Sequence, residues 1–130
     1  MVLDTSAIVA ILAREPEATS FNAMVEADSV RLISAATLLE ASIVIEGRFG
    51  TNGGVDLDNW IMVARVQILP VDAILTEAAR RAWRRFGKGR HPAGLNFGDC
   101  FSYALATARG EPLLFKGDDF SKTDVQVANL

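Results

Sequence analysis

The chain has 130 residues, half of them hydrophobic, and a formal net charge of −3. This length suits a single domain over residues 1–130 with one substantial core. No apolar run reaches the roughly 18 residues of a membrane-spanning helix, and the N-terminus lacks the basic and apolar regions of a signal peptide. One cysteine and one histidine exclude an internal disulfide and a zinc site of the Cys/His kind. We expect a cytoplasmic protein in which any metal is held by oxygen.

Strand-like and helix-like segments alternate along the chain. Strands are predicted at 2–3, 30–33, 66–69 and 113–115, with a candidate fifth strand at 125–128. Helices are predicted at 7–13, 16–26, 35–49, 57–64, 73–86 and 96–109, with Thr5 or Ser6, Ser34 and Asp72 as caps. The glycine-rich segment 50–54 is interpreted as a turn between two helices. This alternation predicts an α/β fold with a mostly parallel sheet of four to five strands, covered on both faces.

Acidic residues stand at strand ends and in apolar settings. Asp4 follows the first strand, and ligands of open α/β sheets bind outside the carboxyl ends of strands. Glu40 lies on a helix that is apolar around most of its surface, where an ionised carboxylate is costly unless it is paired or bound to a cation. Asp99 falls in the first turn of an amphipathic helix. Asp118 and Asp119 follow the fourth strand.

Each of these positions also has a simpler interpretation. Glu40 would then lie at an exposed edge and pair with Arg48. Asp99 would be an ordinary first-turn aspartate, stabilised by the helix dipole. The Gly-Asp-Asp segment that contains Asp118 and Asp119 would be a common turn.

The repulsion among several carboxylates predicts a bound cation if they meet. Two unit charges about 4 Å apart repel by roughly 4 kcal/mol at an effective dielectric of ~20, which is a large part of the ~5–15 kcal/mol that stabilises a domain. Either some carboxylates bind protons or a divalent cation neutralises them. Oxygen ligands favour Mg²⁺ or Mn²⁺, and such an ion activates water for attack on a phosphodiester.

A basic run contrasts with the acidic total charge. Six of the thirteen Lys and Arg residues fall between positions 80 and 90, which predicts either a solvated helix face or a surface that holds a nucleic-acid backbone beside the acids. These residues are Arg80, Arg81, Arg84, Arg85, Lys88 and Arg90.

Four motifs in order resemble one known family, the PIN-domain ribonucleases, and among them the VapC toxins of toxin–antitoxin pairs. The motifs are Met-Val-Leu-Asp-Thr-Ser-Ala at the start, Ser-Ala-Ala-Thr-Leu-Leu-Glu at 34–40, Gly-Leu-Asn-Phe-Gly-Asp-Cys at 94–100 and Leu-Leu-Phe-Lys-Gly-Asp-Asp-Phe at 113–120. The resemblance covers nearly the whole chain. It implies a three-layer α/β/α fold and an endoribonuclease that depends on Mg²⁺ or Mn²⁺.

The resemblance also implies a set of site residues. Asp4 and Asp99 would be the principal metal ligands, and Glu40 would ligate through water or orient the nucleophile. Asp119 fits the fourth acidic position best, with Asp118 as the alternative. Supporting roles would fall to Asp124, Ser6 and Asn96.

The resemblance further implies partners for the chain. They are a VapB-like antitoxin, a second copy of the chain in a homodimer and a structured RNA substrate such as tRNA. Two other functions remain open on the sequence: a catalytically inactive PIN-like module that only pairs with a regulatory partner, and a metal-dependent phosphatase. A thiol nucleophile is rejected, because Cys100 falls on the apolar stripe of its helix.

Overall fold

A four-stranded parallel sheet forms the centre of the computed structural model, which describes residues 1–129. The strands lie in the order β3-β2-β1-β4, and every neighbouring pair is parallel. Their bounds are β1 Val2–Leu3, β2 Leu32–Ser34, β3 Gln67–Leu69 and β4 Leu113–Leu114. Because all four strands run the same way, their carboxyl ends share one edge of the sheet.

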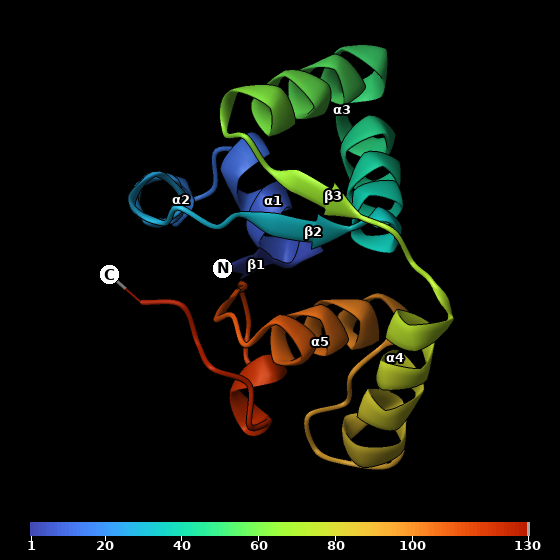
Figure 1. Ribbon diagram of the computed structural model, residues 1–130. Coiled ribbons are helices and arrows are strands. Elements are labelled where there is room, and N and C mark those ends of the chain that lie inside the picture. Colours follow the sequence, from blue (N-terminus) through green and yellow to red (C-terminus); the bar gives the residue numbers. More distant parts are fainter. Residues whose placement is uncertain (130) are drawn as a thin grey trace.

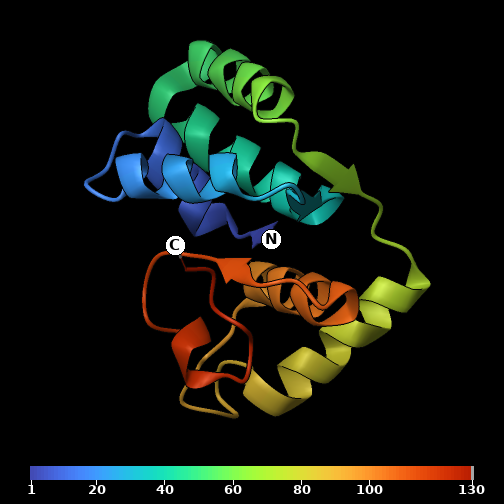
Figure 2. The same ribbon diagram turned by 60° about the vertical axis from the view of Figure 1, so that its left-hand side comes forward.

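Helices cover both faces of this sheet, which confirms the three-layer α/β/α prediction. The helices α1, α2 and α3 lie on one side, and α4 and α5 lie on the other (Figures 1 and 2). Their bounds are α1 Thr5–Leu12, α2 Ala18–Ala27, α3 Ala35–Val63, α4 Ala73–Phe86 and α5 Phe97–Arg109, followed by a short 3₁₀ helix at Phe120–Lys122.

Successive strand residues face opposite layers because side chains alternate along a strand. Val2 and Leu113 belong to the core under α4 and α5, whereas Leu3 and Leu114 belong to the core under α1, α2 and α3. β1, β2 and β4 are short and buried on both faces, as expected for a parallel sheet covered by helices, whereas the edge strand β3 exposes Gln67 and Ile68. Two apolar cores therefore hold the strand ends in a fixed position.

Most predicted elements are present, with two differences at the ends of the chain. The first helix is capped by Asp4, whose carboxylate accepts the amide of Ser6, and not by Thr5 or Ser6 as predicted. The expected fifth strand is reduced to one bridge between Leu113 and Val127. The cap is correctly predicted for α3 at Ser34.

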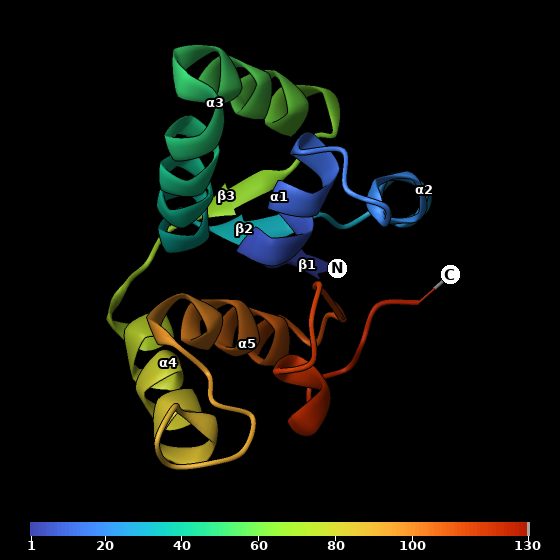
Figure 3. The same ribbon diagram turned by 180° about the vertical axis from the view of Figure 1, so that it is seen from behind.

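The predicted turn at 50–54 is confined to one residue of α3. Gly50 has φ 69° and ψ −161°, and helical geometry resumes directly after it. The two halves of α3 therefore run in different directions (Figure 3). Gly53 and Gly54 are helical and buried, and a Cβ on Gly54 would lie 2.1 Å from an oxygen of Glu46. These two glycines permit close packing within the bend and do not form the turn.

Within residues 1–129, no helix is long and apolar enough to cross a membrane.

The bend in α3 predicts opposite effects for two neighbouring Gly→Ala substitutions. Gly50→Ala should destabilise the fold by about 1–3 kcal/mol, because the conformation of Gly50 is open essentially only to glycine. Gly47 is helical, and a Cβ there would meet nothing within 4 Å. Gly47→Ala should therefore stabilise by about 0.5–1 kcal/mol. Urea unfolding of both variants checks this, and equal effects would contradict it.

Candidate metal centre

Three of the predicted acids line one cavity at the carboxyl edge of the sheet. Asp4 follows β1, Glu40 lies in the second turn of α3 after β2, and Asp99 lies in the first turn of α5. The cavity has a volume of about 430 Å³, and Ser6 and Asn96 also line it. The fold thus brings together residues that are up to 95 positions apart (99 − 4).

Asp4 is buried and held by three hydrogen bonds. Only 3% of the residue's surface is exposed to solvent. Oδ2 accepts the backbone amide of Ser6 at 2.9 Å and its hydroxyl at 2.6 Å, and Oδ1 accepts the hydroxyl of Ser102 at 2.6 Å. These three hydrogen bonds determine the orientation of the carboxylate.

Ser102 is a site residue that the sequence analysis missed. It is buried in α5 among apolar neighbours. In the sequence it therefore cannot be told apart from an ordinary small core residue. The available signal is its spacing, because residues three apart on a helix share one face. Ser102 follows Asp99 at this spacing and therefore faces the same edge of the sheet.

Glu40 lies directly against the first turn of α5. A Cβ on Gly98 would stand 2.0 Å from one carboxylate oxygen of Glu40, which is far inside van der Waals contact. Glycine at position 98 therefore leaves the space that the Glu40 carboxylate occupies beside Asp99. The sequence analysis quoted Gly98 within a motif without assigning this role.

Asp99 carries the clearest electrostatic evidence for an acidic cluster. It forms a capping box with Asn96, in which the amide of Asp99 donates to Asn96 Oδ1 at 2.9 Å and the amide of Asn96 donates to Asp99 Oδ2 at 3.0 Å. Burial is the largest cause that raises the pKa of Asp99, and the charges of Asp4, Asp119 and Glu40 add to it; against the hydrogen bond from Asn96, together they bring the pKa to about 7. A carboxyl group with this pKa is only partly ionised at neutral pH, and a bound cation would favour its charged form.

The two candidates for the fourth acid differ in their relation to Asp99. Both are exposed, and Asp119 precedes the 3₁₀ helix. The charge of Asp119 contributes to the raised pKa of Asp99. The backbone carbonyl of Asp118 accepts the hydroxyl of Ser121. These observations favour Asp119 as the fourth member of the cluster.

Asp124 lies with a different set of partners. Its carboxylate accepts the hydroxyl of Tyr103 and pairs with Arg85 at 2.9 Å. The hydrogen bond from Tyr103 lowers the pKa of Asp124, and the pKa of Tyr103 rises to about 12, chiefly through burial. Asp124 therefore joins the C-terminal segment to α4 and α5 and does not face the acid cavity.

The donor set of the cavity fits a hard divalent cation. Its acids supply carboxylate oxygens, which Mg²⁺ and Mn²⁺ prefer. The hydroxyl of Thr5, which also lines the cavity, is buried without a hydrogen-bond partner. Within residues 1–129, no three acidic, His or Cys side chains are already grouped closely enough to hold a metal ion.

The basic run at 80–90 lies on α4 and on the loop that follows it. Several of its side chains contact other residues of α4. Arg80 and Arg84 both pair with Glu77, at 2.7 and 3.5 Å. The guanidinium of Arg90 lies over the ring of Trp83, 4.7 Å from its centroid. Arg81 and Lys88 are exposed. This face is cationic, but the charges are partly balanced within α4.

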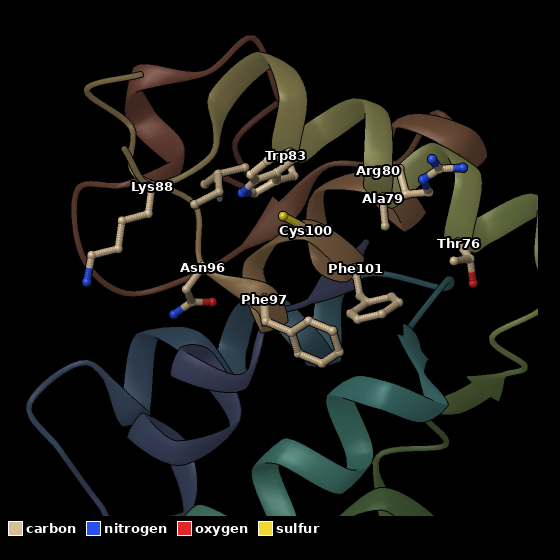
Figure 4. Close-up of a pocket in the computed structure, with 10 residues that line it drawn as sticks. Thr76, Ala79, Arg80, Trp83, Lys88, Asn96, Phe97, Cys100 and Phe101 are labelled. Carbon is tan, nitrogen blue, oxygen red and sulfur yellow. The ribbon is translucent and has the colours of Figure 1, made fainter. Parts of the chain in front are cut away.

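A second cavity of about 510 Å³ lies between α4 and α5 and adjoins the acid cavity at Asn96. Trp83, Phe97 and Phe101 line it, with Arg80 and Lys88 at its rim (Figure 4). Its lining is mainly apolar and carries no carboxylate, so it offers no ligands to a cation.

The chain is similar to known proteins over nearly its whole length. The family model "PIN domain" matches residues 1–126. The chain is 56% identical over 130 residues to the VapC ribonuclease Mb0640 of Mycobacterium bovis, covering 100% of this chain and 99% of that protein. It is 58% identical over 125 residues to a ribonuclease VapC of Mycolicibacterium smegmatis, covering 96% and 97%.

Two solved structures share the fold. VapC20 of Mycobacterium tuberculosis, described as a sarcin-ricin loop cleaving toxin, superposes with a TM-score of 0.78 at 20% identity and 95% coverage of each chain. VapBC2 of Rickettsia felis, bound to a DNA fragment from its promoter, gives a TM-score of 0.74 at 15% identity, covering 97% of this chain and 94% of that one.

The contact between Gly98 and Glu40 predicts a selective effect on metal binding. Gly98→Ala should displace the flexible Glu40 carboxylate while the helix remains intact, and it should weaken Mn²⁺ binding by about tenfold or more. Isothermal calorimetry with Mn²⁺ measures this, with Gly47→Ala as the matched control and circular dichroism as the test of folding. Unchanged affinity in a folded Gly98→Ala protein would show that Glu40 takes no part in the site.

Proposed function

This chain belongs to the PIN-domain family, and from that premise we propose that it is a metal-dependent endoribonuclease toxin held inactive by a VapB-like antitoxin. Ribonuclease activity agrees with the VapC relatives at 56–58% identity. One observation carries the metal dependence: Asp4, Glu40 and Asp99 line a single cavity, where burial and the charges of the neighbouring acids raise the pKa of Asp99 to about 7. Such a cluster is stable at neutral pH only with protons or a cation.

The acidic residues would have different roles in the proposed reaction. Asp4 and Asp99 would hold Mg²⁺ or Mn²⁺, with Glu40 orienting the attacking water and Asp119 completing the negative set. When bound, the cation supplies an acidified water and neutralises charge that develops on the phosphoryl oxygens. Ser6 and Ser102 orient the Asp4 carboxylate through the hydrogen bonds described above.

The proposed substrate class is structured RNA, with tRNA as one candidate. The support is that a structural neighbour is described as a toxin that cleaves the sarcin-ricin loop. The cationic face formed by Arg80, Arg81, Arg84, Arg85, Lys88 and Arg90 would attract the RNA backbone.

We also propose an antitoxin and a homodimer as partners. A structural neighbour is a VapBC pair, and basic side chains of an antitoxin would complement the acid cavity. Apolar side chains near this cavity are exposed, among them Phe97 at 80%, Ile43 at 64% and Leu39 at 62%. Exposed apolar clusters of this kind are typical of protein interfaces.

Neutralising Asp99 tests the proposed activity. Asp99→Asn retains an amide that can cap α5, and it should reduce Mg²⁺-dependent RNA cleavage by more than about a hundredfold, because a metal ligand contributes at least as much as its supporting residues. RNA end mapping and gel assays measure this, with the exposed Asp58→Asn as control. Equal cleavage by Asp99→Asn and wild type would refute the assignment, and a wild type that neither binds Mn²⁺ nor cleaves RNA would favour the inactive binding module.

The proposed partners can be tested in one light-scattering experiment. The chain alone should elute at twice the mass of the 14.0 kDa protomer, and Ile43→Glu should return it to the monomer. Co-expression with the protein of the neighbouring gene should give a larger complex that cleaves no RNA. A monomeric wild type would contradict the homodimer, and a complex that still cleaves RNA would contradict the inhibitory role.

A further inference from the structure

Two cations outside the basic run line the acid cavity itself. Arg48 belongs to the first half of α3 and Lys116 follows β4, and both contribute to the same cavity wall as Asp4 and Asp99. The described residues that line this cavity include none of the six basic residues at 80–90. Sequence analysis considered Arg48 only as a partner of Glu40 and assigned no role to Lys116.

A chain of two hydrogen bonds connects Lys116 to the acidic cluster. The backbone amide of Lys116 donates to the hydroxyl of Ser6 at 3.0 Å, and this hydroxyl donates to Asp4 Oδ2 at 2.6 Å. The position of Lys116 at the cavity is therefore set by the same contacts that orient Asp4.

One glutamate on the turn between α1 and α2 holds both cations. Nζ of Lys116 lies 2.5 Å from Glu15 and 3.2 Å from Glu17, and the guanidinium of Arg48 lies 3.6 Å from the other oxygen of Glu15. Glu40 is thus not the partner of Arg48. Glu15 keeps two positive charges at the cavity while the cavity itself is negative.

These ion pairs are accessible and can exchange with another anion. The side chain of Lys116 is 39% exposed and that of Arg48 is 53% exposed. Ion pairs at this exposure contribute little to stability, whereas charge-assisted hydrogen bonds to phosphate are stronger and Arg can form two in parallel. A phosphate that approaches the cavity can therefore replace Glu15 as the partner of either cation.

The acid cavity needs such cations for the reaction proposed above. Four carboxylates repel a polyanion, and one divalent cation leaves part of that charge uncompensated. Cations at the cavity wall reduce this repulsion at the phosphates next to the scissile bond. In contrast, Arg80 and Arg84 on α4 both pair with Glu77, and neither lines the acid cavity.

We propose that Lys116 and Arg48 bind the RNA phosphates adjacent to the scissile bond and that Glu15 holds both side chains ready in the absence of RNA. This inference rests on the proposed ribonuclease function and deepens it. The alternative is a purely structural clamp, in which the same ion pairs only connect the α1–α2 turn to the end of β4. The two accounts predict opposite results for Glu15.

The experiment measures RNA affinity against salt for Lys116→Gln, Arg48→Gln and Glu15→Gln, with a structured RNA that the wild type cleaves. The two cation variants should each bind about tenfold more weakly and lower the slope of log affinity against log salt by about 0.7–0.9, the value for one lost phosphate contact. Glu15→Gln should bind RNA more tightly. All three should still bind Mn²⁺ by calorimetry, because none of the three residues is among the proposed ligands.

Arg109→Gln is the matched control, because Arg109 is exposed at the far end of α5 from Asp99, and its salt slope should equal that of wild type. Unchanged slopes in the two cation variants would overturn the inference while the metal-dependent cleavage by wild type stands. Weaker RNA binding by Glu15→Gln, together with a lowered melting temperature in all three variants, would establish the clamp instead. A wild type that does not bind RNA would overturn both this inference and the proposed function.

Discussion

Repulsion among carboxylates at one edge of the sheet is the constraint on which the rest of the structure depends. Asp4, Glu40 and Asp99 come from three separate elements, and the parallel direction of β1 and β2 brings the first two to the same edge. At an effective dielectric of ~20, each close pair costs several kcal/mol. Hydrogen bonds that Ser6 and Ser102 donate to Asp4 reduce this cost. Partial protonation of Asp99, whose pKa is raised to about 7, reduces it as well.

The local structure around the cavity serves this arrangement. Asp4 caps α1 and Asp99 completes the capping box of α5, so both carboxylates lie at helix N-termini, where the macrodipole favours negative charge. Gly98 gives Glu40 room beside Asp99. Positive charge is confined to the wall of the cavity, where Glu15 restrains Lys116 and Arg48. This distribution leaves space between the acids for a cation and places positive charge where phosphates would approach.

The layers of the fold and the meeting of the main acids were predictable from sequence, because short apolar strands alternate with helices, Asp4 follows a strand end, and Glu40 and Asp99 stand in apolar helices within motifs of the resembled family. Ser102 was missed because a hydroxyl on an apolar helix has no distinctive sequence pattern, and Gly98 because its role is visible only once Glu40 is placed. The partners of Asp124 and Arg48 depend on tertiary packing. The candidate fifth strand did not form fully, because the segment 125–128 contributes only one bridge to the sheet edge.

Thermal unfolding with and without Mg²⁺, at about pH 5.5 and about pH 8, tests most directly whether the acids form a site that needs a cation. The pKa of Asp99 is raised to about 7 in the folded chain, above the ~3.9 of an unfolded chain. The folded state therefore binds more protons between these values, and the stability of the metal-free protein falls as pH rises through this window. Because Mg²⁺ binds ionised carboxylates, it should raise the melting temperature more at about pH 8, and Asp4→Asn should remove this rise. An equal melting temperature with and without Mg²⁺ at both pH values would contradict the account.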